Sequence, residues 1–384
     1  MHRLTRFRLV SMTRTAADNV MLDQIFSAVA KAPFRLQRLA LRHRHRDLTW
    51  PQSAPKAPET PYFTPQLNSI TALSLIHCVH PSCFPSPFHV ALFSAPKLPL
   101  RDLDLNIVWG RLAGIGDGEL EMRDVLASVH WPQLQRLELT FDRNSFESES
   151  QMKSLRIFFI RHTNLEVVSL CGIPFPDLPA DALPRLRSLN LEFGQGTVYQ
   201  IPHHIARNIH HFMVIIRGDE MLHVLKDMEE LRSCQVMDIR NLAKLHDFSP
   251  HLEQLSYSQP GYWSDWGTGT DVNCGEVQRE VELLKERISQ LAMFTQLTHL
   301  GQFLACFELE INTPMSGNSG LLRELVNSIH TLKYVQICRH GSIVWVRVER
   351  DEEGQYVGFH PLSSSEQIKQ GIHSWGNFYR GFSI

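Results

Sequence analysis

The chain has 384 residues, of which 43% are hydrophobic and 20% are charged, and 38 Lys and Arg against 40 Asp and Glu give a formal net charge of −2. This composition excludes a collagen-like or wholly disordered protein, because the apolar content is ordinary and the net charge is small. No apolar run reaches the length of about 18 residues that a membrane span needs. Seven cysteines, an odd number scattered along the chain, favour reduced thiols and a cytoplasmic or nuclear location.

Residues 1–34 are expected to form a helical and basic segment. Residues 1–50 hold ten Lys and Arg against three Asp and Glu, and apolar residues recur on one side of a predicted helix over 17–30. A basic cluster over 42–46 follows the first repeat, and we interpret it as a solvated loop, with a phosphate or acidic-partner contact as the alternative. Five prolines between Pro51 and Pro65 predict an extended loop.

A repeated apolar pattern organises residues 35–340. Apolar residues recur at positions 1, 4 and 6, often also at 8, and the copies from Leu165 to Leu252 follow one another every 21 to 23 residues. This spacing falls in the range of leucine-rich repeats. The clear copies begin at Leu36, Ile70, Leu100, Leu134, Leu165, Leu186 and Ile209, and weaker ones begin at Leu231, Leu252, Leu297 and Leu332. The copy at Leu297 is doubtful because Gln302 breaks its third position.

Each copy predicts a short strand with one buried face, because alternate apolar residues point to the same side of a strand. One such strand cannot bury its apolar side alone, whereas stacked copies form a parallel sheet covered by helices. Helices are predicted over 152–163, 220–230, 275–294 and 321–330. The apolar stripe of 275–294 also fits a partner-binding coiled coil, but we favour a helix packed on its own sheet.

The strands from Leu134 to Phe141 and from Leu186 to Phe193, introduced by Trp131-Pro132 and Pro184, carry a family resemblance. So does a predicted apolar hairpin over 343–359 with an acidic turn. The chain resembles leucine-rich repeat proteins, and more narrowly the irregular fungal F-box-like families. The resemblance implies an α/β solenoid, a curved parallel sheet with helices on its convex side, closed by a C-terminal β-hairpin cap over 341–384.

In those families the repeats select substrates for a ubiquitin ligase, and a helical module opening with a Leu-Pro pair binds the adaptor subunit. The first 50 residues here contain no Leu-Pro pair. An adaptor subunit is therefore expected as a partner only if a remnant of that module exists. The resemblance implies an intracellular protein-binding role for the chain.

The side chains between the buried leucines are predicted to line the concave face, where a protein partner would bind. Residues 101–150 hold ten Asp and Glu against five Arg, so a basic partner could be steered there, with a merely soluble surface as the alternative. The predicted contact residues are Asp102, Asp104, Asn106, Arg136, Glu138, Asn190 and Glu192. A second candidate is the loop over 257–275, where Tyr262, Trp263 and Trp266 either contact a partner or fold back onto the solenoid.

No catalytic, metal or cofactor site is expected. His77, Cys78, His80 and Cys83 are suitable zinc ligands, but no second ligand pair at a recognised spacing accompanies them. The glycines over 114–118 lack the Lys-Ser/Thr of a phosphate loop, and no Gly-x-Ser-x-Gly elbow is present. We therefore predict a protein–protein interaction scaffold and not an enzyme. The alternative is a zinc- or nucleic-acid-binding regulatory protein that uses the basic N-terminus or the His77–Cys83 cluster.

Overall fold

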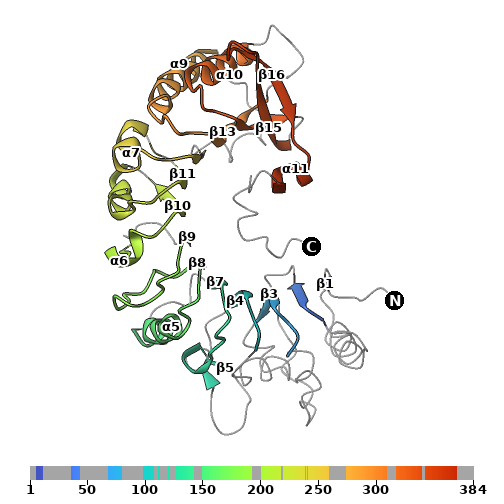
Figure 1. The fold of residues 1–384 in the computed structure, drawn as a ribbon, viewed down its shortest axis with the longest axis vertical. Coiled ribbons are helices and arrows are strands. Elements are labelled where there is room, and N and C mark those ends of the chain that lie inside the picture. Colours follow the sequence, from blue (N-terminus) through green and yellow to red (C-terminus); the bar gives the residue numbers. More distant parts are fainter. Residues whose placement is uncertain are drawn as a thin grey trace. The chain divides into compact units, whose positions relative to one another are not determined.

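The structure, a computed structural model, describes residues 6–11, 36–43, 68–79, 98–107, 111–112, 120–121, 126–141, 149–192, 200–217, 219–237, 239, 241–258, 274–308, 317–339 and 342–369. Contacts divide the described residues into two compact units, unit 1 up to Ile205 and unit 2 from Ala206 onward within Ala206–Phe378 (Figure 1). Both combine helices with an open, mostly parallel array of strands, so the fold is α/β.

Unit 1 is built on parallel strands whose order in space follows their order in the chain. They are β1 (Arg6–Ser11), β2 (Arg38–His43), β3 (Ala72–Val79), β4 (Asp102–Ile107), β7 (Arg136–Phe141), β8 (Val167–Cys171) and β9 (Ser188–Glu192). Their apolar residues stand in register, so that Leu103, Leu137 and Val168 form one buried row. The short strands β5 (Arg111–Leu112) and β6 (Leu120–Glu121) pair separately.

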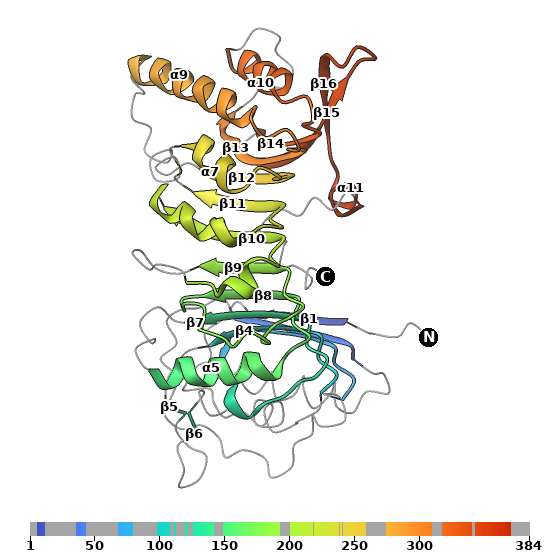
Figure 2. The same cartoon turned by 60° about the vertical axis from the view of Figure 1, so that its left-hand side comes forward.

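Helix α5 (Glu149–Arg161) covers one face of the unit 1 strands (Figure 2). Its Leu155, Phe158 and Phe159 are buried, and the ring of Phe158 contacts that of Trp131 in the bend before β7. A period of about 3.6 residues brings these side chains to one face of the helix. The opposite face of the strands therefore carries the polar side chains that alternate with the leucines.

Unit 2 repeats this arrangement and ends in an antiparallel hairpin. Its parallel strands are β10 (His211–Arg217), β11 (Ser233–Met237), β12 (Gln254–Ser258), β13 (His299–Glu308) and β14 (Tyr334–Arg339), followed by the antiparallel β15 (Ser342–Arg350) and β16 (Tyr356–Pro361). The helical segments lie on one side of these strands (Figure 2). They are the 3₁₀ helix η1 (Asp219–Asp227), α7 (Leu242–Phe248), α9 (Cys274–Leu291) and α10 (Gly317–Ser328). The short α6 (His203–Ala206) precedes β10.

A recurrent bend precedes the strands in both units. The amide of Leu134, the first apolar residue of its repeat, donates to the carbonyl of Trp131 at 3.0 Å, and Leu332 donates to Ile329 in the same way at 3.0 Å. The next repeat then attaches to the bend, because one carbonyl, that of Arg101, accepts the amides of both Gln135 and Arg136 at 2.8 Å. Main-chain bonds of this kind set the register of successive strands independently of the side chains.

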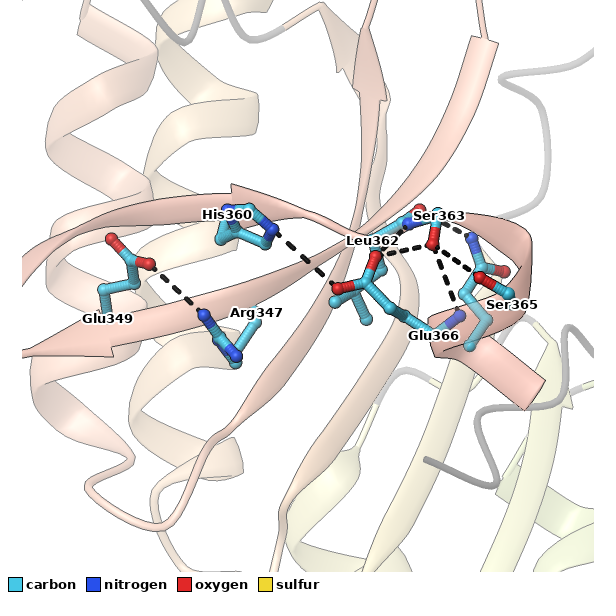
Figure 3. Close-up of polar contacts among 8 residues, drawn as sticks. Arg347, Glu349, His360, Leu362, Ser363, Ser365 and Glu366 are labelled. Carbon is cyan, nitrogen blue, oxygen red and sulfur yellow. Dashed lines mark hydrogen bonds and ion pairs between the residues drawn. The ribbon is translucent and has the colours of Figure 1, made fainter. Parts of the chain in front are cut away.

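The short helix α11 (Ser364–Lys369) directly follows the C-terminal hairpin. The Ser363 hydroxyl and amide donate to Glu366 Oε2 at 2.6 and 2.8 Å, and the Glu366 amide donates back to Ser363 Oγ at 3.3 Å, which forms a capping box (Figure 3). These hydrogen bonds from Ser363 lower the pKa of Glu366. Leu362 packs on Trp345 and Tyr334, so the end of the hairpin adds an apolar cluster to unit 2.

The outer edge of β16 is protected against pairing with another strand. Glu349 pairs with Gly358, whereas Arg350 pairs with Tyr356, which leaves Val357 as an extra, bulged residue. Pro361 ends the strand and offers no amide hydrogen. Bulges and prolines are both devices that discourage edge-to-edge association.

The predicted helices over 152–163, 275–294 and 321–330 correspond to α5, α9 and α10, and the predicted helical segment over 220–230 forms the 3₁₀ helix η1. Strand β1 was not anticipated from the sequence, and the predicted helix over 17–30 lies outside the described residues. The weak copy at Leu297 does form a strand, β13, with register shifts after Leu300 where Gln302 breaks the pattern.

Candidate functional site

The polar face of unit 1 is the side of its strands that alternates with the buried leucines. By register, its rows bring together all seven residues that the sequence predicts as contact residues. Asp102 and Arg136 are paired in the first row, and the second row contains Asp104, Glu138 and Asn190. Asn106 and Glu192 occupy backbone positions in the third row.

Two of these residues are buried within the face. Asp104 is 5% exposed and accepts a hydrogen bond from the Ser74 hydroxyl at 2.6 Å. Asn190 is 6% exposed and donates to the Ser169 hydroxyl oxygen at 3.0 Å. Buried polar groups need such partners, because an unpaired one costs about 1–3 kcal/mol. We infer that Asp104 and Asn190 link neighbouring strands beneath the surface of this face and are not its outermost groups.

The charged side chains that reach solvent on this face have mixed signs. The side chain of Arg136 is 53% exposed and that of Asp102 is 20% exposed, with Arg136 Nε 3.8 Å from Asp102 Oδ1. Burial raises the pKa of Asp102, and the charges of Arg136, Arg38 and Arg101 oppose that rise. Glu138 is half-buried in the next row. The expected acidic patch is therefore partly neutralised by arginines among the described residues.

The polar face of unit 2 is the corresponding side of its strands. Its first row aligns Ser233, Gln254, His299, Tyr334 and Arg347, and its second row aligns Gln235, Ser256 and Gly301. The rings of His299 and Tyr334 stack with centroids 4.8 Å apart. A side chain at Gly301 would not fit easily, because its Cβ would lie 3.1 Å from Ser256 Oγ and 3.4 Å from Gln336 Oε1.

The hydrogen bonds around His299 fix its tautomer. Thr298 Oγ1 donates to the Glu253 carbonyl at 3.0 Å, so its only hydrogen is used and it accepts from His299 Nδ1 at 2.7 Å. Burial, reinforced by the charge of Lys333, lowers the pKa of His299 to about 4. The imidazole is therefore neutral at pH 7, and its Nε2 carries a lone pair and no hydrogen.

Several buried polar atoms on this face have no hydrogen-bond partner within the described part of the chain. They are His299 Nε2, Gln235 Oε1, Ser256 Oγ and Trp345 Nε1. Unit 1 differs, since its Asp104 and Asn190 are paired. Sequence analysis did not select Gln235, Ser256 and His299, which lie in the weaker repeat copies, although the alternation that identified Asp104 applies to them equally. Trp345 lies in the closing hairpin, outside the repeats.

The other candidates from the sequence have different outcomes. Tyr257, expected to open the aromatic loop, lies in β12, where it is buried and its hydroxyl donates to the Ile239 carbonyl at 2.6 Å. Tyr262, Trp263 and Trp266 lie outside the described residues. Of the His77–Cys83 cluster, His77 and Cys78 belong to β3, whereas His80 and Cys83 also lie outside them.

No group of three or more metal-ligating side chains is found where the structure describes the chain. Within the same residues, the helices are too short or too polar to cross a membrane. A search of family models finds none that matches the chain, and a search of curated proteins finds no match either.

Proposed function

We propose that the chain is a leucine-rich repeat solenoid, a curved parallel sheet with helices on its convex side, and that it serves as a protein–protein interaction scaffold. The recurrent bend, the in-register leucine rows and the closing hairpin support this architecture. Stacked repeats of this kind present a wide concave surface made of equivalent positions on successive strands.

The observation that carries the proposal is the alignment of Asp102, Arg136 and Glu138 on neighbouring strands of one face. These charges are only partly buried, so a partner with complementary charges can reach them. Such charges contribute mainly to partner selection and to the association rate. The buried pair of Ser74 and Asp104 holds the second row in place beneath them.

A narrower role, substrate recognition in an F-box-like ubiquitin ligase located in the cytoplasm or nucleus, is part of the proposal and rests on the resemblance of the repeats. It predicts that an adaptor subunit co-purifies with the chain. Absence of any adaptor among the captured proteins would remove this narrower role and leave the scaffold proposal untouched.

Charge reversal on the unit 1 polar face tests the scaffold proposal. In the full chain carrying Asp102→Lys and Glu138→Lys, we expect recovery of the captured partner to fall about tenfold, which corresponds to about 1.4 kcal/mol. The matched control reverses an exposed charge on α5, Arg156→Glu, and should leave capture unchanged. The measurement is quantitative mass spectrometry after affinity capture, with thermal denaturation as a check on folding. Equal capture by both variants would exclude this face as the docking surface.

A further inference from the structure

We infer that the amino-terminal margin of the unit 1 strands binds an extended acidic segment of the partner protein. The residues that carry this inference are Arg101, Arg136 and Arg187, which we call the arginine margin. All three are exposed to solvent. The inference rests on the proposed scaffold function and adds the chemistry of one part of the partner.

The main chain sets the spacing of the arginine margin. The amide of Gln135 donates to the carbonyl of Arg101 at 2.8 Å. In the same way Glu166 donates to Gln135 at 2.8 Å, and Arg187 donates to Glu166 at 2.9 Å. Arg136 directly follows Gln135 in the chain. Arg101 and Arg187 are therefore three strand intervals apart, or about 14 Å.

Positive charge exceeds negative charge around Asp102. Arg136, Arg38 and Arg101 all lower the pKa of Asp102, so three guanidinium groups lie near this one carboxylate. One carboxylate balances only one of these charges. Asp104, the next acidic residue of β4, lies about 7 Å farther along the strand and is 5% exposed. A carboxylate that approaches the margin from solvent therefore meets more attraction than repulsion.

The arginine margin has donors to offer to a ligand. Arg136 approaches Asp102 with Nε at 3.8 Å, beyond hydrogen-bonding distance, and its 53% exposed side chain can hold a carboxylate with both Nη groups. Arg187 Nη1 donates to the Leu186 carbonyl at 3.0 Å, which orients the guanidinium and leaves Nε and Nη2 for a ligand. Within the described part of the chain, neither Arg101 nor Arg187 forms an ion pair.

The spacing predicts the sequence pattern of the ligand. In an extended peptide, side chains four residues apart point the same way and lie about 14 Å apart. Acidic residues at positions i and i+4 would therefore reach Arg101 and Arg136 at one end and Arg187 at the other. The residue at i+2 would lie close to Glu166, which is exposed, so we expect it to be uncharged or basic.

A peptide fits this surface better than a nucleic acid. Every nucleotide carries a phosphate, so a strand that crossed the margin would also bring phosphates against Asp102 and Glu166. Single-stranded nucleic acids gain much of their affinity by stacking on aromatic side chains. The described positions between the arginines hold Gln135, Glu166 and Val167, none of which is aromatic. An acidic peptide can instead place its carboxylates only where the arginines lie.

The test uses the full chain and a phage-displayed library of random peptides as the probe. Selected peptides should be enriched in Asp and Glu at positions i and i+4, and their affinity should fall about tenfold for Arg101→Glu and for Arg187→Glu, or about 1.4 kcal/mol each. Binding should also weaken as salt is raised from about 0.05 to 0.5 M, because exposed charges are screened. The matched control Arg156→Glu reverses an exposed arginine on α5 and should leave peptide binding unchanged.

Selection of peptides without acidic enrichment would overturn the inference. Failure to select any peptide would overturn it too, as would acidic peptides that bind both variants as well as the unmodified chain. A single-stranded RNA homopolymer that binds more tightly than the peptides, and loses its affinity in the same variants, would assign the margin to nucleic acid instead.

The inference and the scaffold proposal can fail separately. The variant with Asp102→Lys and Glu138→Lys keeps the arginine margin and should bind the selected acidic peptides more tightly, because it adds positive charge beside them. Loss of partner capture in this variant, with peptide binding insensitive to the arginine variants, would support the scaffold proposal and refute the arginine margin. Peptide binding that depends on the arginines, with partner capture unchanged by the lysine variant, would support the margin and exclude Asp102 and Glu138 as the docking surface.

Discussion

His162 is a buried histidine whose two ring nitrogens are both used by the main chain of unit 1. Its Nε2 accepts from the Trp131 amide at 2.9 Å, and its Nδ1 donates to the Phe158 carbonyl at 2.7 Å. Its ring stacks on that of Phe158 with centroids 4.0 Å apart. Because Nε2 must accept, protonation of His162 would break the bond that joins α5 to the bend before β7.

We expect unit 1 to lose stability in mild acid through this residue. Burial lowers the pKa of His162 from 6.5 to about 4, so its contribution is complete above pH 6.5 and is lost as the pH falls towards 4. The shift corresponds to about 3 kcal/mol at the lower end of this range. Denaturant unfolding followed by tryptophan fluorescence at a series of pH values measures it. His162→Gln should be less stable at neutral pH but show a flatter dependence, and an equally steep dependence in this variant would contradict the assignment.

At the scale of single elements, the C-terminal end of α10 is held by a side chain from the hairpin. Arg350 on β15 donates from Nη2 to the carbonyls of Val326 and Ile329 at 2.7 and 3.1 Å. The last carbonyls of a helix have no partner within the helix, and a cation there also interacts favourably with the helix dipole. Burial lowers the pKa of Arg350, but its guanidinium remains charged at neutral pH.

We predict that Arg350→Ala lowers the free energy of unfolding of unit 2 by about 1–3 kcal/mol, because both carbonyls lose a charged donor. The matched control is Arg347→Ala on the same strand, whose exposed ion pair with Glu349 at 3.5 Å should contribute less than about 1 kcal/mol. Chemical denaturation of the full chain compares the two variants. Equal effects would show that the bonds to α10 are not the source of the stability.

The elements themselves could largely be predicted from the sequence where the apolar period is strong. The period of residues 275–294 predicted α9. The copy at Leu297 was doubtful because Gln302 breaks its third position, yet it forms β13, whose register shifts after Leu300. The η1 segment was also predicted to be helical, but its 3₁₀ type was not predicted, because composition does not distinguish a 3₁₀ from an α-helix. Strand β1 was missed although Leu4, Phe7 and Leu9 have the spacing of positions 1, 4 and 6, and its register with β2 aligns Phe7 with Leu39 and Leu9 with Leu41.

At the scale of the whole molecule, each repeat of an array contacts only the repeats next to it. A destabilising substitution in one repeat therefore affects mainly the adjacent repeats. Leu139 is 0% exposed and lies in register between Leu105 and Leu170. We predict that Leu139→Ala costs about 2–5 kcal/mol and speeds amide exchange in β4, β7 and β8 far more than in β2. Hydrogen exchange with mass spectrometry measures this. Uniformly faster exchange from β2 to β9 would instead indicate that unit 1 unfolds as one cooperative body.

The sequence predicted which residues of the candidate site share one face of the strands, but not how deeply each side chain is buried. Alternation along the strands placed Asp104, Glu138 and Asn190 on one face, as the register confirms. Alternation does not report what flanks a side chain, so the burial of Asp104 and Asn190 could not be foreseen. The unpaired atoms of unit 2 were equally hidden, because a missing hydrogen bond depends on the positions of every neighbouring group.

The shared carbonyl of each bend has a consequence for how such a chain can vary. Since the amides of Gln135 and Arg136 find their acceptor at Arg101 whatever lies in between, the alignment of adjacent strands does not depend on the length of the connecting segment. Insertions between repeats can therefore grow or shrink without disturbing the ladder. A lineage of such proteins could change the length of these loops while the main-chain bonds between adjacent strands stay the same.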